Sequence, residues 1–212
     1  MSLEILALNM ERGSHWQAWA AFLEACRPDI LLASELDIGC KRSGKLDVPA
    51  ELARRLGLYY VFAEEFRELT QGGSHGNAVF SRYPIKWTKK VTLPREYDWF
   101  FDVQKRTGDR CALLAQLDVD GAPLGVGSIH LENRTGPEGR VRQLRTVLEE
   151  AERLFPHCPV ILGGDLNTNG FDGRDKALIQ KLAQEPDLHR EYLEQVFRRE
   201  PCLPLAMEYG YR

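Results

Sequence analysis

The sequence predicts an α/β protein in which two layered sheets are covered by helices. Short apolar runs of strand length occur throughout the chain, and they follow one another directly in its middle part. Segments with apolar residues at helical spacing lie toward both ends. A regular alternation of strands and helices, which would indicate a wound parallel sheet, is not present, so two stacked sheets with outer helices are favoured.

The N-terminal part of the chain predicts two buried strands separated by a helix. Residues 3–9 and 29–35 are apolar runs of strand length. Residues 15–26 place apolar side chains at helical spacing, and Ser14 and Gln17 have the spacing of a helix capping box. We therefore expect a strand, a helix that starts after Ser14, and a second strand.

The middle of the chain is rich in strand-like segments. A helix is predicted over residues 48–58, with Gly57 as its stop signal. Three strands follow, at residues 59–66, 76–85 and 86–93. The last two are predicted to be neighbouring strands, separated at Pro84.

The remainder of the chain contains the strongest hairpin signal. Residues 110–131 are two apolar runs on either side of Asp120 and Gly121. A helix, a strand and another helix are then predicted at residues 138–155, 158–164 and 173–183. No repeat or linker divides the 212 residues, so one domain over residues 1–212 is expected.

Composition excludes several classes of protein. The 28 basic and 31 acidic residues give a net charge of -3, which argues against a basic nucleic-acid coat but leaves a local basic groove open. No apolar run approaches the ~20 residues of a membrane-spanning helix, and no secretory signal is visible. The five cysteines are odd in number and lack CxxC spacing, so free thiols and a cytoplasmic location are expected.

Polar side chains of useful chemistry follow four of the predicted strands. They are Asn9, Glu35, His130, and the pair Asp165 and Asn167. Because strand ends can converge on one rim of layered sheets, these residues are candidates for one shared site. Glu35 is a hard oxygen ligand that suits Mg²⁺ or Mn²⁺, and Mg²⁺ needs only one or two carboxylates because it keeps several waters.

Each of the other candidates has a chemical role to offer. Asn9 can add an amide oxygen or orient a phosphate, and Asp165 can orient or deprotonate an attacking water. Asn167 and His130 can donate hydrogen bonds to phosphate oxygens, and Arg110 can pair with a phosphate. Taken singly, each also fits an ordinary role as a turn former, a surface charge or a packed side chain.

The order of these motifs resembles the endonuclease/exonuclease/phosphatase superfamily, the deoxyribonuclease-I-like metal-dependent phosphoesterases. The similar segments are "LNMERG", "PDILLASE", "GNAVFSRYPI", "RCALLAQL" with "GSIHLENR", and "VILGGDLNT". The resemblance implies a four-layer αββα sandwich with two mainly antiparallel sheets. It also implies a phosphoester hydrolase that uses Mg²⁺ or Mn²⁺ and in-line attack of water on phosphorus, without a covalent intermediate.

The same resemblance assigns roles to individual residues. It implies Asn9 and Glu35 at the metal, Arg110 at the phosphate, and catalytic positions for the remaining candidates, which are His130, Asp165 and Asn167.

One motif of the family is not found in this sequence. Members carry "SDH" on a last strand, whereas this sequence ends "LPLAMEYGYR". One interpretation is a C-terminal truncation that lacks the last strand; it is favoured because the sandwich would otherwise have an exposed edge. The other is a natural short form, which would act as a non-catalytic phosphate-ligand-binding module.

The substrate is left open by the sequence. Members of the family act on nucleic acids or on lipid and inositol phosphates. The segment "LPREYDWFFDVQKRTGDR" mixes aromatic and basic residues, which suits a groove for a polyanion, an apolar rim for a lipid, or an ordinary connecting loop. The sequence does not determine the oligomeric state.

Overall fold

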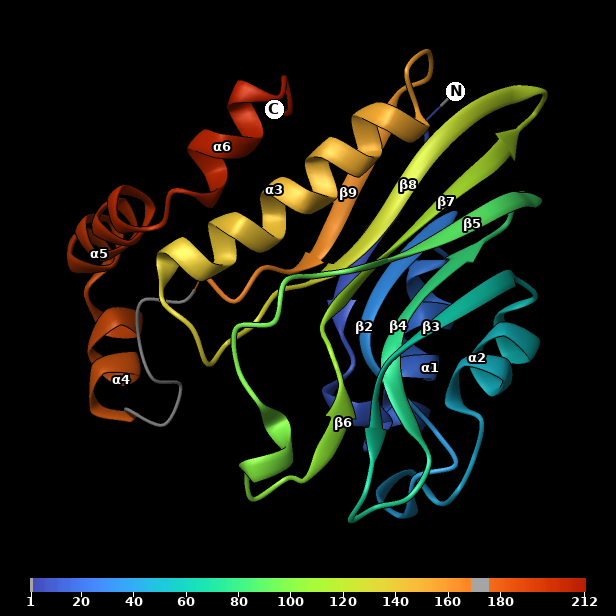
Figure 1. Ribbon diagram of the computed structural model, residues 1–212, viewed down its shortest axis with the longest axis horizontal. Coiled ribbons are helices and arrows are strands. Elements are labelled where there is room, and N and C mark those ends of the chain that lie inside the picture. The colour runs from blue at the N-terminus through green and yellow to red at the C-terminus, as the bar shows by residue number, and fades with distance from the viewer. Residues whose placement is uncertain (1, 169–175) are drawn as a thin grey trace.

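The computed structural model describes residues 2–168 and 176–212, with the side chains of residues 196–199 not included. Two sheets lie face to face, and helices cover their outer sides (Figure 1). The larger sheet has the order β1-β2-β4-β3-β6 and the smaller one the order β5-β7-β8-β9. Only the β1–β2 and β8–β9 pairs among these are parallel, so the expectation of two mainly antiparallel sheets is confirmed.

The elements have the following bounds. The larger sheet consists of β1 (Ile5–Asn9), β2 (Ile30–Ile38), β3 (Tyr59–Glu68), β4 (Ser74–Ser81) and β6 (Arg106–Gly108). The smaller sheet consists of β5 (Ile85–Thr92), β7 (Cys111–Val119), β8 (Ala122–His130) and β9 (Val160–Asp165). The helices are α1 (Trp16–Cys26), α2 (Val48–Leu56), α3 (Pro137–Leu154), α4 (Lys176–Gln184), α5 (Pro186–Arg199) and α6 (Cys202–Glu208). Short 3₁₀ turns are η1 (Glu11–Gly13), η2 (Lys41–Ser43) and η3 (Trp99–Phe101).

Three apolar layers hold these elements together and make four layers of secondary structure. Leu23 of α1 and Leu52 of α2 pack on the outer face of the larger sheet. Leu32 of β2 and Leu113 of β7 belong to the layer between the two sheets. The third layer joins the smaller sheet to α3 and α6, with Leu148 fully packed in it. Figure 1 shows α3 lying along the smaller sheet, and α1 and α2 on the opposite side of the sandwich.

Local sequence signals explain several of these boundaries. The side chain of Asp47 accepts a hydrogen bond from the Ala50 amide and so caps α2, which ends at Gly57 with a φ of 67°. Asp120 and Gly121 both have positive φ, as a two-residue hairpin turn between β7 and β8 requires. The helix and hairpin predicted from these residues are confirmed.

Two local expectations are wrong. The capping box is absent, because α1 begins at Trp16 after His15 and no side chain bonds to its first turn, while Ser14 closes η1. The predicted strands on either side of Pro84 are present, but β4 and β5 lie in different sheets. The physical reason is that β2 and β3 already pair with the two edges of β4, which leaves no edge for β5.

The C-terminal part contains more helix than the sequence predicted. The helix expected at residues 173–183 is present as α4 from residue 176, and residues 173–175 lie outside the described residues. Two further helices, α5 and α6, were not predicted, and α6 packs on α3. All five cysteines lie in the described part and are free thiols. Within that part, no helix has the length and apolar character needed to cross a membrane.

Candidate active site

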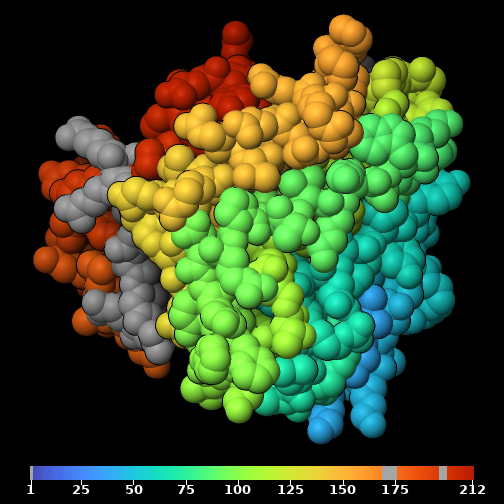
Figure 2. All heavy atoms as spheres, viewed as in Figure 1, coloured from blue at the N-terminus to red at the C-terminus, as the bar shows by residue number. Residues whose placement is uncertain are grey.

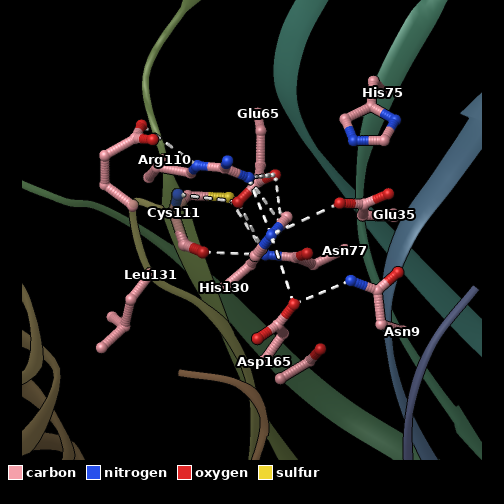
Figure 3. Close-up of polar contacts among 12 residues, drawn as sticks. Asn9, Glu35, Glu65, His75, Asn77, Arg110, Cys111, His130, Leu131 and Asp165 are labelled. Atoms are coloured by element: carbon pink, nitrogen blue, oxygen red, sulfur yellow. Dashed lines mark hydrogen bonds and ion pairs between the residues drawn. The ribbon is translucent and has the colours of Figure 1, made fainter. Parts of the chain in front are cut away.

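The predicted site residues come together at one rim of the sandwich. Asn9, at the end of β1, pairs with Ser34 of the parallel strand β2, and His130, at the end of β8, pairs with Asp165 of β9. The Nε2 atom of His130 lies 3.7 Å from Glu35 Oε1 and 4.0 Å from Asp165 Oδ2. Figure 3 shows these side chains pointing toward a common centre.

Glu35 reaches the rim through a β-bulge and not from a strand end. In the pairing of β2 with β4, Ala33 faces Ala78 and Leu36 faces Gly76, so Ser34 and Glu35 together oppose the single residue between them. Glu35 has a φ of 58°, and β2 continues to Ile38. The expectation that the strand ends at Glu35 is therefore wrong, because the charged residue is accommodated by one extra position in the strand.

The carboxylate of Asp165 is held by two hydrogen bonds. Asn9 Nδ2 donates to its Oδ2 at 2.8 Å, and the Asn167 backbone N–H donates to its Oδ1 at 2.9 Å. Asn167 has a φ of 49° and donates from its amide to the carbonyl of Leu131 at 2.8 Å. Residues 165–167 thus form a turn, and this turn also holds the Asp165 carboxylate in place. The ordinary role as a turn former and the functional role are therefore compatible.

The approach of β9 to β8 at this point requires glycine. A Cβ on Gly164 would lie 2.0 Å from the carbonyl oxygen of Ile129, and Gly164 has a φ of 139°. Because no other residue fits this space and this backbone conformation, the glycine before Asp165 fixes where the carboxylate stands.

His130 rests on a buried carboxylate that the sequence analysis missed. Its Nδ1 lies 3.0 Å from Oε2 of Glu65, a fully buried residue of β3. A carboxylate only accepts, so Nδ1 carries the proton of that bond and Nε2 faces Glu35 and Asp165. Burial raises the pKa of Glu65, but the charges of His130 and Arg110 and the bond to His130 outweigh it and leave the pKa at about 2.

Arg110 lies behind His130. Its side chain is 4% exposed. The guanidinium pairs with Glu65 at 3.4 Å and Glu132 at 3.3 Å and lies 5.2 Å from the ring centre of Phe66. Its Nη1 is 2.8 Å from Nδ1 of His130 and 2.9 Å from Nε2. The geometry orients the imidazole, and the direct contact of Arg110 with a phosphate stays a prediction.

A second buried network lies next to Glu35. Asp37 bonds to His75 at 2.8 Å and to Arg42 at 2.6 Å, and Arg42 continues to Glu68 at 2.9 Å. Burial raises the pKa of Asp37, yet its bonds to His75 and Arg42 bring it below its usual range. Burial also lowers the pKa of His75, so its ring is neutral at neutral pH.

Glu35 has the properties of a ligand for a hard cation. Its side chain is 22% exposed, and within the described residues no hydrogen bond reaches its carboxylate. Burial raises its pKa, but electrostatic interactions with neighbouring groups, among them His130, Arg110 and Arg12, outweigh this and hold the pKa below the usual value, so the carboxylate is ionised. The described residues contain no cluster of three His, Cys, Asp or Glu side chains around one point. One carboxylate with amide oxygens and waters is sufficient for Mg²⁺.

The comparisons with known proteins agree with this architecture. The family model described as the Endonuclease/Exonuclease/phosphatase family matches residues 6–181. A solved endonuclease/exonuclease/phosphatase from Beutenbergia cavernae is 23% identical, with a TM-score of 0.59 over 81% of this chain and 49% of its own. No curated protein matches the sequence.

Two other solved structures carry more specific descriptions. A mannosyl-6-phosphatase from Bacteroides thetaiotaomicron is 18% identical, with a TM-score of 0.57 over 85% of this chain and 71% of its own. ANGEL2, a 2′,3′-cyclic phosphatase, is 14% identical, with a TM-score of 0.55 over 78% of this chain and 52% of its own. The chain thus spans between about half and about seven tenths of the length of these structures. With the family model matched over most of its length, the chain belongs to the endonuclease/exonuclease/phosphatase family.

Proposed function

We propose that the protein hydrolyses a phosphoester by in-line attack of water on phosphorus, with a divalent cation held at Glu35. The observation that carries this proposal is the position of His130 Nε2, which lies within 4.0 Å of both Glu35 and Asp165 although the three residues come from different strands. Family membership and the phosphatases among the structural relatives support the reaction class.

Asp165 is proposed to position and deprotonate the attacking water. Its two oxygens are fixed by Asn9 and by the Asn167 backbone, and each keeps a lone pair for the water. The water oxygen forms the new bond to phosphorus while the ester bond to the leaving oxygen breaks, and the proton of the water passes to the carboxylate.

His130 is proposed to donate a hydrogen bond from Nε2 to a phosphate oxygen. The ring stands among the carboxylates of Glu35, Glu65 and Asp165 and beside the Arg110 guanidinium. The bond to Glu65 on the other nitrogen keeps the ring in this orientation. Negative charge that develops on the phosphoryl group would thus meet a preoriented donor.

When bound, the cation would neutralise negative charge on the phosphoryl group and the leaving oxygen. Glu35 would hold it, and Asn9 can contribute because its Oδ1 accepts one hydrogen bond from the described residues, that of the Glu11 amide. Asn167 uses one amide hydrogen on Leu131 and keeps the other for a phosphate oxygen. Mg²⁺ and Mn²⁺ are the two cations proposed for this position.

The surface beside the site favours a substrate with an apolar portion. Phe101 and Val103 are 81% and 94% exposed. Of the basic residues in the same segment, Arg106 and Arg110 are buried and Arg95 pairs with Asp109, so that only Lys105 is exposed without an ion pair among the described residues. Figure 2 shows this segment as a light-green lobe projecting from the lower part of the molecule. A nucleic-acid groove would instead offer free cations, so a lipid-like phosphoester is proposed over a polyanion.

The test is hydrolysis of an aryl phosphodiester with Mg²⁺ or Mn²⁺ by the full 212-residue chain. Replacing Asp165 by Asn keeps the shape and removes the proton acceptor, so we expect a loss of ~10²–10⁴-fold in kcat/KM. Asp187→Asn, at a residue whose side chain is 90% exposed in α5, is the matched control and should leave the rate unchanged. Equal rates for Asp165→Asn and wild type would contradict the proposed role.

A second candidate function is the binding of a phosphate ligand without turnover. It is favoured by the pairing of His130 with Arg110 and Glu65, which engages the imidazole within the protein. In the same assay it predicts binding of the cation and of the phosphodiester, with no release of the aryl alcohol.

A further inference from the structure

Two buried acceptor atoms beside Glu35 have no partner. His75 and Asn77 are both fully buried, and His75 Nε2 and Asn77 Oδ1 are among the buried side-chain atoms without a hydrogen-bond partner within the described residues. The two residues are two positions apart on β4, so their side chains leave the same face of the sheet. The register places the bulge that contains Glu35 opposite Asn77.

The identity of both atoms as acceptors follows from their neighbours. The 2.8 Å contact with the Asp37 carboxylate puts the proton of His75 on Nδ1. Buried Nε2 has no acceptor to donate to within the described residues, so it carries the lone pair. The amide nitrogen of Asn77 donates to the Cys111 carbonyl at 2.8 Å and to Glu65 at 3.2 Å. Exchanging the two ends of this amide would set oxygen against oxygen, so Oδ1 must point away.

The two acceptors face a third one. In Figure 3, Glu35 lies between His75 and Asn77, and the ring of His75 is turned toward the Glu35 carboxylate. An ionised carboxylate, an imidazole lone pair and an amide oxygen repel one another unless something positive stands among them. Buried acceptors without a partner are costly, and a cation satisfies all three at once.

We propose that Glu35, His75 Nε2 and Asn77 Oδ1 together bind the divalent cation, and that the nitrogen donor makes the site prefer Mn²⁺ over Mg²⁺. Mg²⁺ binds oxygen ligands almost exclusively, whereas imidazole nitrogen suits first-row transition metals. Asp37 behind Nδ1 is the arrangement in which a carboxylate fixes the tautomer and orientation of a ligating histidine. The inference rests on the proposed function in that the same cation is held at Glu35.

The decisive measurement is the electron spin echo envelope modulation of Mn²⁺ bound to the 212-residue chain. A ligating imidazole couples its nitrogen to the electron spin, so the wild type should show ¹⁴N modulation that changes when histidine is labelled with ¹⁵N. Titration of Mn²⁺ and Mg²⁺ by calorimetry should show tighter binding of Mn²⁺. Mn²⁺ bound without any nitrogen coupling would overturn the inference and leave the proposed function standing.

Variants then assign the nitrogen to one residue. His75→Asn places an amide nitrogen where Nδ1 stood, which keeps a donor for Asp37 and removes Nε2. We expect it to lose the ¹⁴N modulation and to weaken Mn²⁺ binding by ~10–100-fold while Mg²⁺ binding changes less. His130→Asn, beside Glu35 on the other sheet, should keep the modulation. The opposite pattern would assign the nitrogen to His130 and overturn the inference.

Two more controls distinguish the loss of a metal ligand from a failure to fold. His189→Asn carries the same substitution at an exposed position of α5 and should change no metal parameter. If His75→Asn does not fold, the ligand can be identified by elimination among the five histidines. We then expect the ¹⁴N modulation to be retained in His130→Asn and in a variant with Asn at His15, His157 and His189. This result would leave His75 as the ligating histidine. Absence of Mn²⁺ binding to the wild type, together with absence of turnover, would overturn both the inference and the proposed function.

Discussion

The space between the two sheets has an apolar end and a charged end, and the same strands supply both. Toward the apolar end, β2 contributes Leu32 and β8 contributes Val126. Toward the charged end, the same two strands contribute Asp37 and His130. These four side chains are all at most 1% exposed, so exposure does not distinguish the apolar pair from the charged pair. The comparison shows that one end of a strand can stabilise the fold while the other end carries the side chains of the candidate site.

The two ends differ in what their burial costs. Apolar side chains stabilise the fold when they leave water, by about 25 cal/mol per Å². Buried charges are costly unless each one is paired, and the charged end consists of carboxylates set against arginines and histidines. We therefore expect substitutions that reduce side-chain volume to lower the free energy of unfolding at the apolar end. At the charged end, we expect substitutions that remove the partner of a buried charge to lower it.

The largest effect is expected from removing one partner at the charged end. Glu65→Ala leaves Arg110 and His130 without their shared carboxylate, and a broken buried ion pair costs about 3–5 kcal/mol. Urea denaturation should show this loss. Glu150→Ala, in a surface pair with Arg153, is the matched control and should cost less than about 1 kcal/mol. Similar losses for the two variants would remove the distinction between the ends.

A somewhat smaller effect is expected at the apolar end. Leu117 is fully buried between the sheets, and Leu117→Ala should reduce the free energy of unfolding by about 3 kcal/mol through lost burial and a cavity. Mn²⁺ affinity of the folded variant should equal that of the wild type. Leu69→Ala, at a side chain that is 48% exposed, controls for the substitution itself. A changed metal affinity in Leu117→Ala would show that the two ends are coupled.

Lowering the pH should reduce the stabilisation that comes from the charged end and leave that of the apolar end unchanged. The pKa of Glu65 is lowered from 4.5 to about 2 in the folded protein, so its stabilisation is complete above pH ~4.5 and is lost as the pH falls toward 2. Between pH 5 and pH 3, unfolding free energies should fall more for the wild type than for Glu65→Gln, which has no proton to bind. Leu117→Ala should follow the wild-type slope. Parallel slopes for wild type and Glu65→Gln would refute this assignment.

The smallest effect is expected away from both ends. Asp47 caps α2 on the outer face of the larger sheet through the Ala50 amide. Asp47→Ala should lower stability by about 1 kcal/mol, as a lost helix cap does. Calorimetric titration should find Mn²⁺ binding unchanged. The Asp47→Ala variant is thus the reference for a loss of stability that does not affect the metal site.

The layered fold was predictable because its signals are local. Apolar runs, the Asp120-Gly121 turn and the stop at Gly57 each act over a few residues, and the structure confirms the elements they predict. Sheet membership is not local: the separation of β4 and β5 into different sheets depends on β2 and β3 occupying both edges of β4. No pattern around Pro84 contains that information.

The site was only partly predictable for the same reason. The candidates from four strands do converge, and their motifs were recognisable one by one. The bulge at Glu35 depends on the register with β4, and the sequence shows only an acid followed by more strand. Glu65 was missed because an acid in a strand-like segment suggests a surface residue, whereas its burial is made possible by Arg110 and His130 from the other sheet.

The hydrogen bond from Asn9 to Asp165 joins residues 156 positions apart, and this has a consequence for how the protein is made. Contacts between distant parts of a chain form late, because the entropy of closing the loop must be lost before they stabilise anything. A nascent chain can pair β2, β3 and β4 long before β9 leaves the ribosome. The bond that holds Asp165 in place would form only after β9 has been synthesised, so a growing chain would be folded in part well before it could act.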